Sequence, residues 1–399
     1  MTLIWGPHRY PIMTSRSTPK RVPANVAKLI VAASETHADL LYATGFFAPD
    51  PFIFFIHRGR KFLVMSDLEI DRAKVQARVH TVLPMSRYER LLRAASVKNT
   101  DLAAVLARVL ADRRIHSVIV PGSFPLGLAE QLRKSGLRVH VSLGPFFPRR
   151  EIKTPEEAGE IRKSQLAAEA GVAAAIQVLR DSKIRLDGAL WWNGSRLTSQ
   201  TLKQQISVAA LEHGCVASRT IVACGEQGVD PHQEGSGLLK AHQPIIIDVF
   251  PRSQQSGYWG DITRTVVRGR ASDRLKAQYQ AVFRAQQLAL QEIRPGISGR
   301  AVHQKVVDYF EQQGFATGNA GGRMLGFFHG TGHGVGLEIH EAPRLSSKGD
   351  DRLRVGHVVT VEPGLYYAGV GGIRLEDLVV VTPTGLRNLT RFPKYLEIG

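Results

Sequence analysis

The chain has 399 residues, of which 43% are hydrophobic and 22% charged, and its formal net charge is +17. This length exceeds what one hydrophobic core usually holds, so we expect two domains. The composition is ordinary for a globular protein and no apolar run has the length of a membrane span, so a membrane protein is not expected.

The cysteines and the first residues indicate where the protein works. Two cysteines, Cys215 and Cys224, exclude a disulfide framework, although one bridge between them stays possible. The short apolar start of residues 1–17 is broken by Gly and Pro, so no signal peptide is predicted. We therefore expect a cytoplasmic protein.

The positive charge is concentrated in the first part of the chain. Residues 1–150 hold 23 Lys and Arg against 10 Asp and Glu, whereas residues 151–399 hold 29 against 25. A basic half can bind nucleic acid or an acidic partner. Here the basic residues are scattered and few aromatic residues lie between them. We expect a solvated basic surface and no nucleic-acid partner.

Strand patterns alternate with helical patterns in residues 1–150, which predicts an α/β domain. The clearest feature is a hairpin over 51–69, in which two apolar runs flank the basic turn HRGR. The other elements, in chain order, are a strand and an apolar segment over 27–46, a helix over 100–115, a strand over 116–122, a helix over 125–136 and a strand over 137–144.

Prolines and arginines near residue 150 predict a boundary between two domains, 1–150 and 151–399. A helix begins at Thr154, a capping residue that Pro155 and two acids follow. The order helix, helix, strands then occurs twice, which predicts a duplicated α+β unit. Its elements are helices over 155–183 and 198–214, strands over 219–225, 244–251 and 257–269, helices over 273–293 and 299–314, and strands over 357–367 and 371–385.

Four carboxylates lie inside segments that otherwise belong in a core: Asp248, Asp261, Glu362 and Glu376. A buried carboxylate without a partner is very costly, so each needs a cation, a proton or a metal. For any single one, an ion pair with a nearby arginine is the simpler explanation. The candidate arginines are Arg252, Arg264 and Arg374.

The spacing of the four acids favours a metal centre instead. Asp248 and Asp261 flank one predicted hairpin, and Glu362 and Glu376 flank another. Cross-strand neighbours on one face lie roughly 5 Å apart, and two carboxylates that close repel unless a divalent ion lies between them. An oxygen-rich set with one imidazole suits two divalent ions such as Mn²⁺, Co²⁺, Fe²⁺ or Zn²⁺.

The glycine-rich stretch 327–341 supplies three histidines, His329, His333 and His340. It does not match the dinucleotide or P-loop fingerprints. Residue 344 is Arg, so His340 has no partner at the spacing of a zinc helix, and Gly235-Ser236-Gly237 is not a nucleophile elbow. A two-metal hydrolase is the interpretation that remains.

Five motifs in order carry a resemblance to a known family. They are Asp248; Gly257-Tyr258-x-x-Asp261-x-Thr263-Arg264-Thr265; His329-x-x-x-His333-Gly334-x-Gly336 with His340-Glu341; Val361-Glu362-Pro363-Gly364; and Ile373-Arg374-x-Glu376-Asp377. Residues 150–399 resemble the pita-bread metallopeptidases, which include Xaa-Pro aminopeptidases, prolidases and methionine aminopeptidases. "YATGF" and "SDLEIDRAK" resemble the creatinase and prolidase N-terminal domain. The resemblance implies an α+β pita-bread catalytic domain with an internal pseudo-twofold axis, after an α/β creatinase-like domain.

The resemblance also implies a metal centre and its ligands. By the family's pattern the ligands are Asp248, Asp261, His333, Glu362 and Glu376, with Asp261 and Glu376 bridging both ions. Two divalent ions are implied, Mn²⁺ first, with Co²⁺, Zn²⁺ or Fe²⁺ as alternatives. Creatinases share the fold without these ligands, and the presence of all five here argues against that branch.

Catalytic roles follow from the same resemblance. His340 and His232 would contact the substrate and stabilise the tetrahedral intermediate, while Glu362 would move a proton to the leaving amine. His329, Thr263 and Arg374 match residues near the site, for which we expect supporting roles. The implied reaction is hydrolysis of the Xaa-Pro bond of short peptides by a metal-bridging hydroxide, in a homodimer.

One departure and several alternatives complete the prediction. Asp248 and Asp261 are two residues further apart than is common in the family, a change that preserves the face of the strand on which each lies. The choice between aminopeptidase and prolidase stays open. Two other functions were weighed: a non-catalytic scaffold that binds protein or nucleic acid through its basic N-terminal domain, and hydrolysis of a non-peptide C–N or P–O bond.

Overall fold

The computed structural model describes residues 25–399, which form two compact units, the first ending at Phe146 and the second beginning at Phe147. The stretch 1–17, on which the predicted absence of a signal peptide depends, lies outside the described residues. Among residues 25–399, no helix is both long enough and apolar enough to cross a bilayer. Cys215 and Cys224 are both free thiols, so the possible bridge between them does not form.

The first unit is a six-stranded mixed sheet with helices, in agreement with the predicted α/β domain. Its strand order is β4-β3-β2-β1-β5-β6, and the predicted hairpin is β2 with β3. The strands are β1 Val26–Ala32, β2 Phe52–His57, β3 Arg60–Met65, β4 Thr81–Pro84, β5 Ser117–Val120 and β6 Arg138–Val141. The helices are α1 Ala38–Thr44, α2 Ile70–Gln76, α3 Met85–Ala94, α4 Leu102–Ala111 and α5 Leu126–Lys134.

The second unit has two long helices and a mixed sheet, whose strand pairs are antiparallel except for the parallel pair of β14 and β24. Helix α6 begins where the sequence predicts it, because Thr154 and Glu157 form a capping box. The sheet has the order β11-β12-β14-β24. The elements of this half are η1 Pro148–Glu151, α6 Pro155–Asp181, β7 Lys183–Ile184, β8 Leu190–Trp192, β9 Ser195–Arg196, α7 Ser199–Glu212, β10 Cys215–Val216, β11 Ile221–Cys224, η2 Gly225–Val229, β12 Pro244–Val249, β13 Arg252–Ser253 and β14 Ile262–Arg268, with β24 Glu397–Ile398 from the end of the chain.

The other half of the second unit repeats the arrangement. Helices α8 and α9 precede a sheet of order β18-β17-β19-β22-β23. The elements are α8 Asp273–Glu292, α9 Gly299–Gln312, β15 Gly318–Ala320, β16 Arg323–Leu325, β17 Gly332–Gly334, β18 Glu341–Leu345, β19 Val358–Val361, β20 Gly364–Tyr367, β21 Gly371–Arg374, β22 Asp377–Thr382 and β23 Gly385–Asn388.

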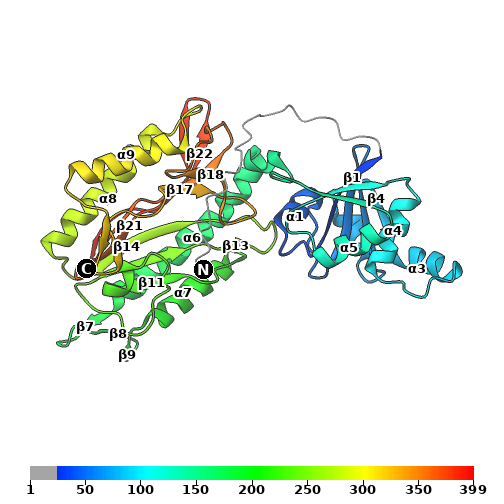
Figure 1. Cartoon of the computed structure of the whole chain (residues 1–399). Helices are drawn as coiled ribbons and strands as arrows, with labels where there is room; N and C mark the ends of the chain where they lie inside the picture. The colour runs from blue at the N-terminus through cyan, green and yellow to red at the C-terminus, as the bar shows by residue number, and fades with distance from the viewer. Residues whose placement is uncertain (1–24) are drawn as a thin grey trace, which may run out of the picture. The chain divides into compact units, whose positions relative to one another are not determined.

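Each half has its own core, which confirms the predicted duplication. Ile176 of α6 and Ile206 of α7 pack in one cluster with Ile247 of β12. Val282 of α8 and Val306 of α9 belong to the matching cluster of the second half. Within the second unit the two helix pairs lie on opposite sides of the strands (Figure 1). Burying each such side chain contributes roughly 1.5–3 kcal/mol to the stability of the fold. This packing fixes the paired helices against the strands whose ends carry the acids.

Candidate metal centre

Strand register brings the predicted acids toward each other. Strands β12 and β14 are antiparallel with Asp248 opposite Thr263, so Asp261, two residues earlier, lies on the same face as Asp248. The connection is not the simple hairpin that the sequence predicts. Within it, the short strand β13 pairs with β10. The longer connection between β12 and β14 is therefore itself paired, through β13, with β10.

The second pair of acids is brought together in the same way. Val361 pairs with Asp377 and Gly364 pairs with Arg374, so the register on both sides places Glu362 opposite Glu376. Both acids lie between strand segments, where the regular ladder is interrupted.

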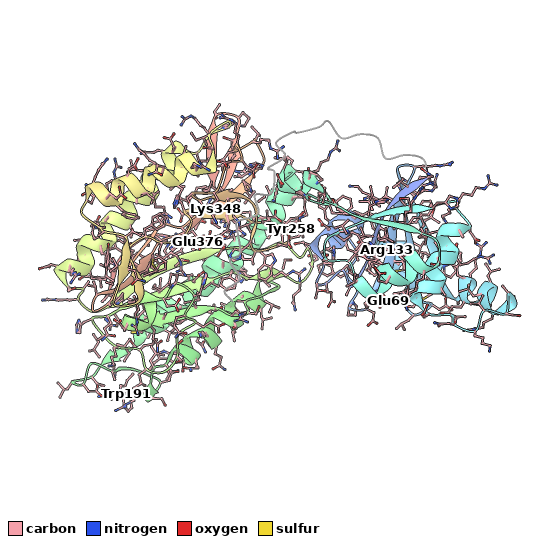
Figure 2. All side chains as sticks on the ribbon, viewed as in Figure 1. Glu69, Arg133, Trp191, Tyr258, Lys348 and Glu376 are labelled. Carbon is pink, nitrogen blue, oxygen red and sulfur yellow. The ribbon has the colours of Figure 1, made fainter. Side chains whose placement is uncertain are left out.

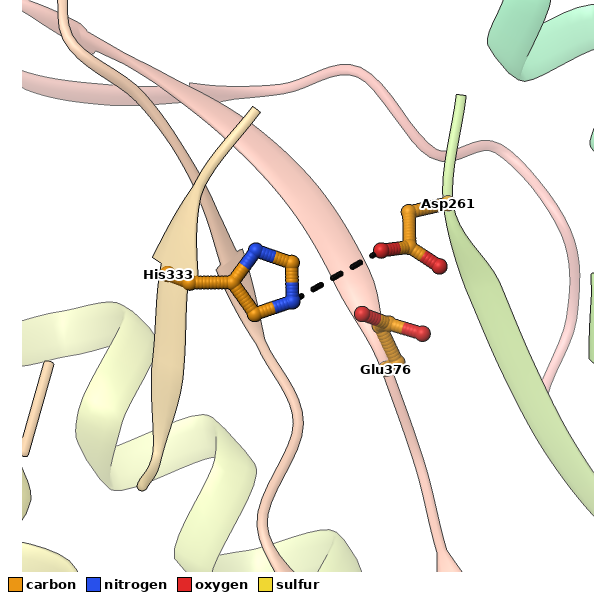
Figure 3. Close-up of side chains that lie close together, drawn as sticks. All are labelled: Asp261, His333 and Glu376. Atoms are coloured by element: carbon orange, nitrogen blue, oxygen red, sulfur yellow. Dashed lines mark ion pairs between the residues drawn. The ribbon is translucent and has the colours of Figure 1, made fainter. Parts of the chain in front are cut away.

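Three of the predicted ligands converge on one point. Ligand atoms of Asp261, His333 and Glu376 all lie within 4.8 Å of one another, and all three residues are buried (Figure 3). His333 Nε2 lies 3.8 Å from Asp261 Oδ2 and 3.2 Å from Glu362 Oε1. Glu376 lies inside the second unit, among the strands (Figure 2). Four of the five predicted ligands therefore lie close together in the structure: His333 and the three acids Asp261, Glu362 and Glu376.

The carboxylates of this cluster repel one another. Burial raises the pKa of Asp261 well above its usual range, and the charges of Glu376, Asp248 and Glu362 raise it further. Burial and the charges of Glu362 and Asp248 likewise hold the pKa of Glu376 well above normal. Four acids within electrostatic reach of each other are stable together only with protons or cations among them.

Glu362 differs from its neighbours. Burial raises the pKa of its carboxyl, but the hydrogen bond and charge of His333, together with the charges of His329 and Arg374, lower the pKa more, to about 2. Glu362 is therefore ionised at neutral pH while Asp261 and Glu376 favour protons.

Asp248 has one oxygen in an ion pair and one without a partner. Arg374 Nη2 donates to Asp248 Oδ2 at 2.6 Å, so one of the predicted arginine pairs does form. Asp248 Oδ1 is buried and accepts no hydrogen bond from the described part of the chain. Arg264 instead pairs with Asp377. An orphaned buried carboxylate oxygen is rare, and a cation on the open side of Asp248 would satisfy it.

The orientation of His333 suits a metal ligand. Its Nδ1 lies 3.1 Å from the carbonyl oxygen of Gly334, so the Nδ1–H donates there, and Nε2 is the ring nitrogen that faces the carboxylates. The backbone around it is tightly packed, because a Cβ on Gly332 would lie 2.0 Å from the carbonyl oxygen of Thr360. Glycine at 332 therefore lets β17 approach β19 and brings the imidazole to the acids.

Thr263 and Arg374 support the acids, as the resemblance implies. Thr263 Oγ1 donates to Glu376 Oε2 at 2.8 Å, and Arg374 Nε donates to Thr263 Oγ1 at 3.2 Å. Arg374 also bonds Tyr366 Oη at 3.1 Å. One guanidinium thus orients Asp248 directly and Glu376 through Thr263.

His329 lies beside this network rather than among the acids. Its Nδ1–H donates to the carbonyl oxygen of Gly330 at 2.7 Å, and its Nε2 accepts from the Tyr366 hydroxyl at 2.9 Å. Burial lowers the pKa of His329 to about 4, so the ring is neutral at pH 7. Tyr366 was not predicted as a site residue, and nothing in the local sequence distinguishes it from Tyr367.

His340 and His232 lie at the exposed side of the cluster. The His340 ring is perpendicular to that of His333, with 4.4 Å between ring centroids. Burial, and next the charge of His333, lower the pKa of His340 to about 4. His232 is exposed on a loop where its backbone N–H donates to Asp230 Oδ1 at 3.0 Å. Its charge lowers the pKa of both His329 and His340, so all three lie in one neighbourhood.

Two buried glutamines also belong to the site, although the sequence analysis missed them. Gln165 of α6 bonds the backbone of Asp261, and Gln286 of α8 bonds backbone carbonyls next to Glu362 and Glu376. The available signal was an amide beside apolar residues of a helix: Gln165 precedes Leu166 and Ala167, and Gln286 follows Ala285.

The loop that carries His340 is held by a buried ionic cluster. Lys153 Nζ donates to Glu341 Oε1, and Arg150 Nη2 donates to Glu341 Oε2 at 3.0 Å. The side chains of Lys153 and Glu341 are 1% and 5% exposed. Glu341 immediately follows His340, so the two cations fix the end of the histidine loop.

Replacing Glu341 with Gln is expected to destabilise the protein by about 3–5 kcal/mol, because Lys153 is then buried without a counter-charge. Urea unfolding measures this change. The control is Glu160→Gln, which removes an ion pair with Lys163, whose side chain is 70% exposed; we expect at most about 1 kcal/mol there. Equal effects of the two substitutions would contradict the assigned role of Glu341.

The donor set fits divalent cations. It consists of buried carboxylate oxygens with one imidazole nitrogen, a chemistry that suits Mn²⁺, Co²⁺, Fe²⁺ or Zn²⁺. The orphaned oxygen of Asp248 is the observation that favours a cation over protons alone.

Comparisons with known proteins agree on the family. The model for "Metallopeptidase family M24" matches residues 159–383. An uncharacterized peptidase of Bacillus subtilis, YqhT, is 41% identical over 179 residues, which cover 45% of this chain and about half (48%) of that protein. The Xaa-Pro dipeptidase of Pyrococcus horikoshii is 30% identical over 285 residues, 71% of this chain and 75% of that one. The crystal structure of the X-Pro aminopeptidase of Thermotoga maritima has a TM-score of 0.78 at 24% identity, covering 94% and 97% of the two chains.

Proposed function

Since the chain belongs to metallopeptidase family M24 and has the pita-bread fold of its structural neighbours, we propose that it hydrolyses the Xaa-Pro bond of short peptides with divalent metal ions. The observation that carries the proposal is the convergence of Asp261, His333 and Glu376, with Glu362 in contact with His333. The scaffold alternative is not favoured, because a non-catalytic chain gains nothing from buried carboxylates that repel each other.

Five side chains would hold the ions. We assign Asp261 and Glu376 as shared ligands by the family's pattern, which their ligand atoms within 4.8 Å of each other and of His333 support. Asp248 would serve one ion, and His333 with Glu362 the other. Two divalent ions, Mn²⁺ first, held by these residues would supply a Lewis acid for the scissile carbonyl and would lower the pKa of a bound water, so that hydroxide would be available near neutral pH.

The chain's own residues would then bind the peptide and move protons. His340 is neutral at pH 7 and retains an N–H that can donate to the oxyanion as it develops. Glu362 is ionised, so it can accept a proton and return it to the leaving amine. His232 is exposed on its loop and can contact a bound peptide. Arg374 and Thr263 keep the carboxylates in place.

His340→Ala is expected to lower kcat by about 10²–10³-fold, the usual cost of removing one donor to an oxyanion. Bound metal should stay unchanged, because His340 is not among the five assigned ligands. Steady-state kinetics and metal analysis of the same preparation test both parts. Loss of metal in proportion to activity would make His340 a ligand and overturn its assigned role.

A substrate comparison tests the proposed reaction. Purified protein reconstituted with Mn²⁺ is assayed on Gly-Pro and on a longer peptide with Pro in second position, and on matched peptides with Ala in place of Pro. Turnover of Gly-Pro alone favours a dipeptidase, and turnover of the longer peptide favours an aminopeptidase. Absence of turnover on all of them, with metal bound, would direct the search to non-peptide C–N or P–O bonds. Failure to bind any divalent ion would end the enzyme proposal.

We also propose a homodimer and a cytoplasmic location. The two free cysteines, Cys215 and Cys224, support a reducing compartment. Light scattering of the purified protein measures the oligomeric state, and fractionation of cells measures the location.

A further inference from the structure

Gln165 acts on the backbone of Asp261 as a neighbouring strand would. Its Oε1 accepts from the Asp261 N–H at 2.7 Å, and its Nε2 donates to the Asp261 carbonyl oxygen at 2.9 Å. Gln165 is fully buried, and α6 approaches so closely that a Cβ on Gly260 would lie 2.5 Å from the Ser164 backbone. Asp261 immediately precedes β14, so the amide replaces the ladder partner that this residue lacks.

Gln286 performs the equivalent task in the other half. Its Nε2 donates to the carbonyl oxygen of Val361 at 2.9 Å and to that of Leu375 at 3.0 Å. These residues immediately precede Glu362 and Glu376 in the chain. Both acids lie in interruptions of the ladder, between β19 and β20 and between β21 and β22. A single amide therefore ties the two interrupted segments together beside their acids.

The two glutamines occupy matching places. Gln165 comes from the first helix of one half and Gln286 from the first helix of the other. Satisfying buried backbone groups is an ordinary reason for a buried amide, so the bonds alone do not establish a role in the site. What distinguishes these two is their target: three of the five assigned ligands are held at the point where strand pairing stops. A metal centre needs ligands fixed within a few tenths of an ångström.

We propose that Gln165 and Gln286 are positioning residues that fix the backbone of Asp261, Glu362 and Glu376 and thereby set the affinity of the centre for divalent ions. The inference rests on the proposed function, because it takes these acids as ligands. According to this inference, two side chains that are not themselves ligands of the ions or contacts of the peptide set the affinity for metal. Outer residues of this kind typically contribute 10–100-fold in metal affinity.

Helix α8, which carries Gln286, also offers a matched control. Gln278 of α8 is also buried, and its Nε2 donates to the carbonyl oxygens of Leu365 and Gly371 at 2.7 and 3.2 Å. Those carbonyls belong to the β20–β21 hairpin, and neither residue is adjacent to one of the acids in the chain. Replacing Gln278 removes the same kind of bonds from the same helix, so it measures the general cost of leaving two buried carbonyls unpaired.

The test compares Q165M, Q286M and Q278M with the wild type in the absence of peptide. Methionine keeps the length of the side chain and removes its donors and acceptor. Binding of Mn²⁺ is measured by calorimetry, binding of Co²⁺ by its visible absorption, and stability of the metal-free protein by urea unfolding. We expect 10–100-fold weaker binding for Q165M and Q286M and binding within about threefold of wild type for Q278M. Losses of stability should be similar for Q286M and Q278M and larger for Q165M, because Gln165 Nε2 also donates to Thr390 Oγ1 at 3.0 Å.

Two results would overturn the inference: unchanged metal affinity in Q165M and Q286M, or an equal loss in Q278M. If a methionine variant does not fold, a more conservative variant replaces it. Q165E keeps the acceptor for the Asp261 N–H, and Q286H keeps an N–H donor. For these variants we expect a smaller loss of metal affinity, in the same direction. A wild-type protein that binds no divalent ion would refute the proposed function itself, and the metal-only measurement separates that failure from this one.

Discussion

His333→Ala is expected to abolish turnover and to weaken metal retention together. The substitution removes the imidazole whose Nε2 faces Asp261 and Glu362, so the metal ions lose one ligand atom. We expect kcat/KM to fall by about 10³-fold or more, which corresponds to about 4 kcal/mol of transition-state stabilisation. Metal analysis after dialysis should give less than one ion per chain.

The control for this prediction is His213→Ala. His213 ends α7 and is exposed, with Nδ1 at 2.9 Å from the carbonyl oxygen of Ala209, outside the acid cluster. Its replacement should leave activity and metal content unchanged. An active His333→Ala protein with full metal content would refute the ligand assignment.

The second large effect concerns pH and metal removal. In the metal-free protein the pKa values of Asp261 and Glu376 are raised well above those of the unfolded chain, so the folded state binds more protons. Stability then falls as pH rises from about 4 through the raised pKa values. Glu362, with a pKa of about 2, acts in the opposite direction, but only below about pH 4.5. The imidazoles of His329 and His340, with pKa values of about 4, also act in the opposite direction between about pH 4 and 6.5, so the effect of the two acids is measured above that range.

Metal ions should reverse this trend. A ligand carboxylate must be deprotonated, so metal affinity increases with pH. At a concentration a thousandfold above Kd, each ion adds about 4 kcal/mol, or roughly 8–16 °C in Tm for a unit of this size. We expect a large increase in Tm on adding Mn²⁺ at pH 8 and a small one at pH 5.

Thermal unfolding with chelator and with Mn²⁺, at pH 5 to 8, measures both effects. The Asp261→Asn variant serves as the control, because it removes one raised pKa and one shared ligand: its metal-free form should depend less on pH, and Mn²⁺ should stabilise it little. A metal-free wild-type protein that becomes more stable between pH 7 and 8, where the histidines no longer titrate, would contradict the clustering of the acids.

Local signals in the sequence were sufficient for much of the fold. Thr154 and Pro155 predicted the start of α6 because a capping box involves residues only three apart. Two apolar runs around HRGR predicted the β2–β3 hairpin, because its two strands and their turn follow one another directly in the chain. Each signal lies within one element, so no knowledge of the rest of the chain was needed.

The buried acids could be identified in the same way, but their partners could not. Four carboxylates in apolar segments are costly to bury, so each of them requires a partner. Three arginines were candidates for Asp248, and it was tertiary packing that selected Arg374, 126 residues away, and gave Arg264 to Asp377. Sequence carries no distance, so the choice among candidates needs the pairing of strands.

The sequence by itself determined the elements, the duplicated order of helices and strands, and the set of side chains that chemistry requires to meet. The tertiary structure decided how they meet: the register that aligns Glu362 with Glu376, the connection between β12 and β14, the Tyr366 hydroxyl between His329 and Arg374, and the two glutamines at the ends of the ladders. The physical reason is that helix caps and hydrophobic periodicity are properties of neighbouring residues, whereas a hydrogen bond between residues about a hundred positions apart exists only after the helices have packed on the sheets.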